Sequence, residues 1–115
     1  MFQDKMVLCA SSAYEKKFYL NENFEGLPQH VKDELKIMCV LFTEDVGGVP
    51  SLEFDENGNL ELNTSADEGD LLYDEIGSVL KIKQMQQEKQ ELFESLETYY
   101  KVFFLGEDIE DDNGD

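Results

Sequence analysis

The hydrophobic and polar positions of the first twenty-one residues follow a pattern that is typical of two strands. Residues 6–10 (MVLCA) form a short apolar run with a β-branched member, which predicts a buried strand. In residues 16–21 (KKFYLN), Phe18 and Leu20 are two positions apart and would share one face of a second strand. The chain is therefore predicted to open with two consecutive strands, although Tyr14 and Phe18 also fit a helical spacing.

A helix is predicted to begin at Pro28, because proline fits the first helical position, where a missing N–H costs no hydrogen bond. Apolar residues then recur at helical spacing and mark one face, made of Val31, Leu35, Met38 and Phe42. Residues 37–42 (IMCVLF) are apolar on all sides, which predicts a centrally buried helix. The pair Gly47-Gly48 is expected to end it with a left-handed cap.

Residues 51–62 (SLEFDENGNLEL) contain a partial calcium-loop pattern, since Asp55, Asn57 and Asn59 stand at positions 1, 3 and 5 of an EF-hand loop. That loop also requires Gly at position 6 and a bidentate Glu at position 12, where this chain has Leu60 and Ala66. The flanks alternate apolar and polar residues, which is typical of strands. The sequence therefore predicts a β-hairpin here and no calcium site.

The register of this hairpin follows from the positions of its apolar residues. A three-residue loop of residues 56–58 pairs Phe54 with Leu60, and the four apolar side chains of both strands then share one face. A two-residue loop would instead pair Phe54 with Glu61 and mix the two faces. The longer loop is predicted, with Gly58 in the left-handed conformation.

The chain from about residue 70 to 105 is predicted to form one long helix, because it has no Pro, one interior Gly and mostly strong helix formers. Its start has several capping candidates, namely Ser65, Asp67 and Asp70. Such a helix would be roughly 50 Å long, whereas a compact domain of this size has a radius of gyration of only about 13 Å. It must overhang, bend near residues 77–78, or meet a partner. Its first apolar residues are expected to face the core; they are Leu72, Ile76, Val79 and Leu80.

From residue 82 onward the spacing of apolar residues is three and four, which is typical of a coiled-coil seam. The seam consists of Ile82, Met85, Lys89, Leu92, Leu96, Tyr99 and Phe103. Lys89 is its one polar member and would restrict the register and the number of partners. The spacing suits two structures equally: a helix packed on its own sheet, or an interface with a second copy or another helical protein.

Composition narrows the range of partners. Acidic residues outnumber basic ones 27 to 9, the net charge is −18, and every basic residue is Lys. Because Arg is absent and the charge opposes counterion release, direct binding of nucleic acid is not expected, nor is adsorption to an anionic membrane. No run approaches the ~20 apolar residues of a membrane helix. Basic proteins remain a fitting class of partner.

The length of 115 residues and the 41% hydrophobic content suit one domain, which we place at residues 1–106. Residues 107–115 (EDIEDDNGD) form an acidic tail that we expect to be disordered.

Sites of catalytic chemistry are not apparent in the sequence. His30 is the single histidine and is expected to be exposed in the first turn of a helix, without an orienting partner. Cys9 and Cys39 lie in apolar runs and match no metal pattern, so we expect reduced core thiols in a cytoplasmic protein. Residues 45–50 (DVGGVP) lack the features of a phosphate loop. No enzymatic activity and no cofactor are expected.

Two acidic clusters could form a pocket if the fold brings them together. Glu44 and Asp45 end the first helix, and Asp67, Glu68 and Asp70 precede the last one. Together they would hold a cation or a partner's lysine; apart, they would be a solvated acidic rim of the ordinary kind.

Four segments, residues 8–24, 27–48, 51–62 and 67–107, resemble a family of small proteins of clostridial anaerobes whose function is not known. The resemblance covers roughly residues 6–107. It implies a bacterial, cytoplasmic protein and carries over no catalytic or binding residues.

The pattern as a whole predicts an α+β fold in the order β-β-α-β-β-α. An antiparallel sheet of about four strands would carry two helices on one face, the C-terminal helix being long. The favoured function is a non-enzymatic interaction module that associates through this helix. The alternatives are an acidic mimic of nucleic acid that occupies a basic protein, and a domain that binds a small ligand or a cation.

Overall fold

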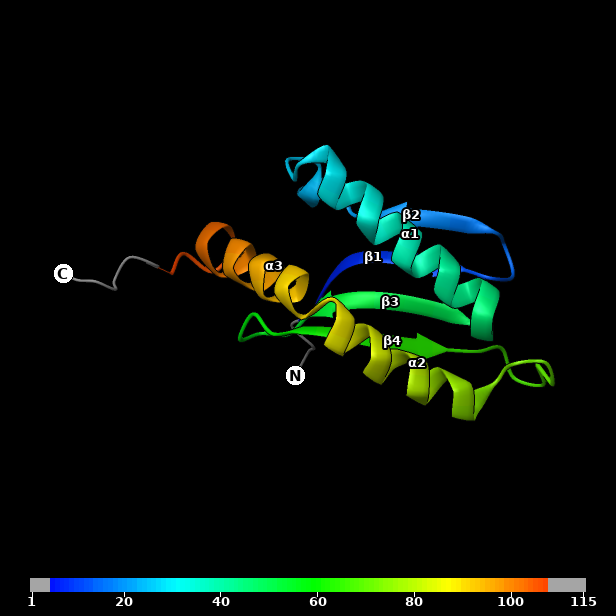
Figure 1. Ribbon diagram of the computed structural model, residues 1–115. Coiled ribbons are helices and arrows are strands. Elements are labelled where there is room, and N and C mark those ends of the chain that lie inside the picture. Colours follow the sequence, from blue (N-terminus) through cyan, green and yellow to red (C-terminus); the bar gives the residue numbers. More distant parts are fainter. Residues whose placement is uncertain (1–4, 108–115) are drawn as a thin grey trace.

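The computed structural model describes residues 5–107, and within them four strands and three α-helices form an α+β fold (Figure 1). The elements are β1 (Met6–Ser12), β2 (Lys17–Leu20), α1 (Gln29–Val46), β3 (Val49–Phe54), β4 (Leu60–Ser65), α2 (Glu75–Glu88) and α3 (Gln90–Phe103). The predicted fold class and the predicted antiparallel sheet are confirmed. The predicted acidic tail lies outside the described residues, apart from Glu107.

The sheet has the strand order β2-β1-β3-β4, and all neighbouring strands are antiparallel. Helix α1 contacts β1 and β3, and α2 contacts β4, so both helices cover the same face of the sheet (Figure 1). The opposite face has half-exposed polar residues such as Ser51, Glu53 and Asn63. This one-sided cover is the usual arrangement of an antiparallel sheet, whose second face can meet water.

The hairpin between β3 and β4 has the predicted register. Phe54 faces Leu60 and Leu52 faces Leu62. The Asp55 N–H donates to the Asn59 carbonyl at 2.9 Å, and the turn closes through Gly58, whose φ is 87°. The three-residue loop is therefore confirmed, and it places all four apolar side chains in the core.

Replacing Gly58 with valine should lower the free energy of unfolding by about 1–2 kcal/mol, because a β-branched residue is strained at positive φ. A Cβ at this position would also lie 2.8 Å from Cγ of Lys101. Gly58→Asn is the matched control, since asparagine tolerates the left-handed region. Urea unfolding of both variants tests this, and an equal cost for valine and asparagine would contradict it.

Helix α1 begins after Pro28 and ends at Gly47, as predicted, and the Gly47 N–H donates to the Thr43 carbonyl. Gly47 has φ 80° and ψ −162°, so it does not adopt the predicted left-handed helical conformation. The expectation of burial on all sides is wrong, however. Ile37 is 57% exposed and Leu41 is 47% exposed. Only one face of α1 packs on the sheet, and its other apolar side chains stay at the surface.

The single long C-terminal helix is also corrected, because the chain forms two helices that are separated at Lys89. The break does not occur at Gly77-Ser78, and Lys89 itself has φ −110° and ψ 24°. The helix starts at the cap residue Asp74, which accepts the Gly77 N–H at 2.7 Å, and not near Asp70. Separation at Lys89 lets α3 pack its own apolar face beside the β3–β4 hairpin.

The core joins the sheet to all three helices. An aromatic cluster connects the 3₁₀ turn after β2, strand β3 and helix α3: Phe24, Phe54, Tyr99, Tyr100 and Phe104. The closest pair of rings is Phe54 and Tyr100, whose centroids are 4.2 Å apart. This cluster is what positions α3 at the end of the sheet.

Two further features belong to the core and its border. Cys9 and Cys39 are both buried free thiols, as predicted, and their sulfur atoms are 3.9 Å apart. At the edge of the sheet, the Leu60 N–H donates to a carboxylate oxygen of Glu97 on α3 at 2.8 Å.

Candidate functional site

The predicted seam faces the protein's own core over most of its length. Met85 and Leu96 are 7% and 2% exposed and belong to the hydrophobic core. Three further members are partly buried against that core: Ile82, Leu92 and Tyr99. At the end of the seam, Phe103 is 71% exposed. A partner could therefore contact Phe103 directly, whereas Met85 and Leu96 are almost entirely covered in the folded chain.

Lys89, the polar member of the seam, lies at the junction of α2 and α3. Its ammonium group pairs with the Glu34 carboxylate of α1 at 2.8 Å. The residue thus connects α1 to the C-terminal helices within one chain, which explains a polar residue at this apolar spacing.

The exposed apolar surface lies instead on α2 and the loop before it. We call this surface the α2 outer face; it consists of Leu71, Leu72, Ile76, Val79 and Leu80, with exposures of 95, 93, 77, 54 and 62%. Four of these side chains, all except Leu71, were expected to face the core, and that expectation is wrong. The inner side of α2 is formed by Ser78, Ile82 and Met85, so helical geometry turns Ile76 and Leu80 toward water.

A groove of about 440 Å³ separates α1 from α2. Met38 and Met85 form its buried part, and the exposed Ile37 and Leu41 lie along its α1 side. Ion pairs link the two helices at both ends, Asp45 with Lys81 at 2.7 Å and Glu34 with Lys89 at 2.8 Å. Exposed apolar side chains therefore occur on α1 as well as on α2.

The charge of α2 differs from that of the chain. The helix has two acidic residues, Glu75 and Glu88, and two basic ones, Lys81 and Lys83, so its net charge is zero. By the same count α1 has four acids and two lysines, and α3 has three acids and one lysine. Helix α2 is the one of the three that adds nothing to the net charge of −18.

The two predicted acidic clusters do not form one pocket. Glu44 lines a cleft beside β2, and Asp45 pairs with Lys81. Asp67, Glu68 and Asp70 line a separate cavity of about 360 Å³. No group of three or more His, Cys, Asp or Glu side chains in residues 5–107 is arranged to hold a metal ion. These carboxylates therefore lie at separate places on the surface. One of them, Asp70, accepts a hydrogen bond from another side chain.

That side chain is Tyr14, in the turn between β1 and β2. Its hydroxyl donates to the Asp70 carboxylate at 2.5 Å and accepts the Asp67 N–H at 2.9 Å. The hydrogen bond to Asp70 raises the pKa of Tyr14 above its ordinary value. The contact ties the loop that bears Leu71 and Leu72 to the far end of the sheet.

The residues that resemble the start of a calcium loop form hydrogen bonds with one another around Asp55. Its carboxylate accepts the N–H groups of Asn59 and Asn57, each at 2.9 Å. The bond from Asn59, with smaller help from its neighbours, lowers the pKa of Asp55. Acidic and amide residues at these positions therefore build the turn.

Asp55→Asn should destabilise the chain at neutral pH by about 0.5–1 kcal/mol, a value reduced for solvent exposure. Because the folded-state pKa of Asp55 is lowered, its stabilisation is present above the ordinary carboxyl pKa and disappears as pH falls through the lowered one. The gap between wild type and variant should therefore close in acid. Urea unfolding across pH measures it, with the exposed Glu56→Gln as control; a gap independent of pH would contradict it.

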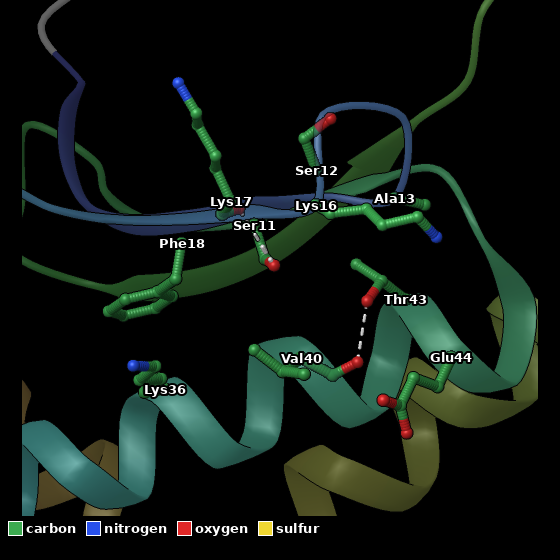
Figure 2. Close-up of a pocket in the computed structure, with 10 residues that line it drawn as sticks. All are labelled: Ser11, Ser12, Ala13, Lys16, Lys17, Phe18, Lys36, Val40, Thr43 and Glu44. Carbon is green, nitrogen blue, oxygen red and sulfur yellow. Dashed lines mark hydrogen bonds between the residues drawn. The ribbon is translucent and has the colours of Figure 1, made fainter.

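The largest cavity described, about 560 Å³, lies between α1 and the β1–β2 hairpin. Figure 2 shows Ser11 and Phe18 pointing from the strands toward α1, where Val40 and Thr43 face them. Lys36 and Lys16 stand at its two ends, whereas Lys17 extends away from α1. We call this cavity the α1–β2 cleft.

Single residues that the sequence singled out have simple surroundings. His30 is exposed in the first turn of α1, as expected, and borders the groove between α1 and α2. The neighbouring Cys39 thiol and burial raise the pKa of Cys9, which keeps this sulfur protonated and unreactive. Within residues 5–107, no helix has the length and apolar character needed to cross a membrane.

Comparison with known proteins gives one match. A model for a family of unknown function matches residues 5–108, which is nearly the whole chain. No curated protein and no solved structure matches.

Proposed function

The chain belongs to this family of unknown function, DUF6145, and we propose that it is a non-enzymatic protein-interaction module that self-associates through the α2 outer face. The observation that carries the proposal is the exposure of five large apolar side chains on one helix and its preceding loop. Contiguous apolar surfaces of this kind mark interaction sites in soluble proteins.

The charge of α2 is compatible with binding of a second copy of the chain at this surface. Two chains of net charge −18 repel each other, so contact costs least where the local charge is lowest. Helix α2 is electrically balanced, with Glu75 near its start and Lys83 eight residues later. Both side chains are exposed, and neither makes an ion pair within the described part of the chain.

An antiparallel pair of α2 helices uses this charge pattern. If the helices cross near Val79, Glu75 of each copy lies close to Lys83 of the other, because a twofold axis makes every contact reciprocal. Ile76, Val79 and Leu80 then meet their counterparts at the centre. The apolar contact supplies affinity and the two ion pairs select the antiparallel direction.

This arrangement changes the residues expected from sequence but keeps the C-terminal helical region as the interface. Phe103 stays exposed and lies outside the proposed contact. The buried free thiols Cys9 and Cys39 support a reducing setting such as the cytoplasm. We therefore place the module there, as the resemblance to bacterial proteins also implies.

Sedimentation equilibrium over a range of concentrations tests the proposal. Wild type should dimerise, and the double variant Ile76→Glu with Leu80→Glu should be monomeric with an unchanged circular dichroism spectrum, since both side chains are exposed. The matched control, Ser95→Glu with Thr98→Glu, adds the same charge to exposed positions of α3 and should stay dimeric. A wild type that stays monomeric at high micromolar concentration would overturn the proposal.

A charge swap tests the antiparallel direction. Glu75→Lys and Lys83→Glu should each weaken the dimer, and the two changes together should restore it. Weakening that accumulates in the double variant would contradict the pairing of Glu75 with Lys83. A monomer that instead captures basic proteins with a steep dependence on salt would favour the acidic mimic.

A further inference from the structure

The α1–β2 cleft brings cationic side chains together on a strongly acidic chain. Three of the nine basic residues line it, although acidic residues outnumber basic ones threefold. Two of these, Lys16 and Lys36, stand at opposite ends of the cleft (Figure 2). Both are exposed, and neither forms an ion pair with any residue from 5 to 107.

Lys16 and Lys36 are two of the five lysines for which no ion pair is found among residues 5–107. Four other lysines of the chain do form ion pairs, namely Lys5, Lys32, Lys81 and Lys89. Lys16 also has a φ of 56°, the one positive value among the described non-glycine residues. This backbone conformation is strained for a residue with a side chain, and it fixes where the Lys16 side chain leaves the turn.

The wall between the two ammonium groups carries apolar side chains as well as hydroxyls. Phe18 and Val40 face each other across the cleft, with Ala13 nearby (Figure 2). The hydroxyls of Ser11 and Thr43 already donate to backbone carbonyls of Lys17 and Val40, at 3.3 and 2.6 Å. The free polar groups of the cleft are thus its charged ends, and its middle offers contact to carbon.

We propose that the α1–β2 cleft binds a small carboxylate that has an apolar body. One of the two ammonium groups would neutralise the carboxylate as a point charge, and the Phe18–Val40 wall would contact the carbon skeleton. The volume of the α1–β2 cleft, about 560 Å³, is in the range of small-molecule sites. Inorganic phosphate, which has no apolar part, uses only half of these features and should bind more weakly.

Glu44 gives the proposal an opposing control, because this acidic residue also lines the cleft. Figure 2 shows its carboxylate pointing away from Lys16. A bound anion is repelled by Glu44 and attracted by Lys36. Neutralising the two residues must therefore change affinity in opposite directions if an anion binds here. A ligand held by apolar contact alone would respond to neither.

Titration of isotope-labelled protein with benzoate, followed by amide NMR, tests the site. Saturable shifts should be confined to residues 11–18 and 36–44, should be absent with the neutral analogue benzamide, and should need more inorganic phosphate than benzoate. The double change Lys16→Gln with Lys36→Gln should weaken benzoate binding about fivefold, as expected for the loss of one solvated charge contact. Glu44→Gln should strengthen it, and Lys101→Gln, beside the distant hairpin, should leave it unchanged.

Three results would overturn the proposal. One is the absence of saturation at millimolar benzoate, and another is a set of shifts spread evenly over all lysines. The third is an equal affinity of wild type and the doubly substituted Lys16→Gln, Lys36→Gln chain. The dimer variants leave the cleft intact, so failure here does not bear on self-association.

Discussion

Leu96→Glu should unfold the protein. The side chain is 2% exposed in the core of α3, and a carboxylate there would lie among apolar neighbours without a partner. An uncompensated buried charge costs about 3–5 kcal/mol, a large share of the roughly 5–15 kcal/mol that stabilises a typical domain. Circular dichroism should show loss of helix, and thermal unfolding should show loss of the cooperative transition.

The neighbouring Ser95→Glu is the matched control, because it adds the same charge to an exposed position of the same helix. Its effect on the free energy of unfolding should stay within about 0.5 kcal/mol. The pair of variants also separates the two structures that the seam spacing allowed. If Leu96→Glu stayed folded and only lost a dimer, α3 would be an interface and the burial of Leu96 in its own core would be wrong.

Phe24→Ala should cost about 3–5 kcal/mol, the second large effect. Phe24 is fully buried, and its ring stacks on Phe104 and Phe54 at centroid distances of 4.8 and 5.7 Å. Removing the ring leaves a cavity where the turn after β2, strand β3 and α3 meet. Urea unfolding measures the loss as a lower midpoint at unchanged slope.

Two comparisons make the aromatic prediction specific. Phe103→Ala removes the same ring from a side chain that is 71% exposed and should cost far less. Phe24→Leu keeps most of the volume and should cost an intermediate amount, since the ring contacts are lost but the site is filled. Equal losses for Phe24→Ala and Phe103→Ala would show that the cluster does not hold α3.

The sequence predicted best where the deciding interactions are local. The register of the β3–β4 hairpin follows from a few residues, because Gly58 and the alternation around it permit one arrangement of the faces. The limits of α1 likewise follow from Pro28 and Gly47. In both places backbone chemistry within a few residues decides the structure.

Predictions failed where tertiary contacts decide. The break at Lys89 has no Gly or Pro to announce it, and it depends on Glu34 and on an aromatic cluster distant in sequence. Helix α2 has apolar residues on two sides, so periodicity could not tell Ile82 and Met85, which face inward, from Ile76 and Leu80. The α1–β2 cleft was missed because Lys16 and Lys36 are twenty residues apart and belong to elements that only the fold brings together.

The bond from the Leu60 N–H to Glu97 satisfies a backbone donor at the open edge of strand β4. Strand β4 is an edge of the sheet, and an open edge with alternating apolar residues is a template for growth of cross-β fibrils. The Glu97 carboxylate of α3 accepts the outward-pointing Leu60 N–H of this edge strand. An incoming strand would have to displace Glu97 before it could pair at that position. Helix α3 thus covers part of this sheet edge as well as contributing side chains to the core.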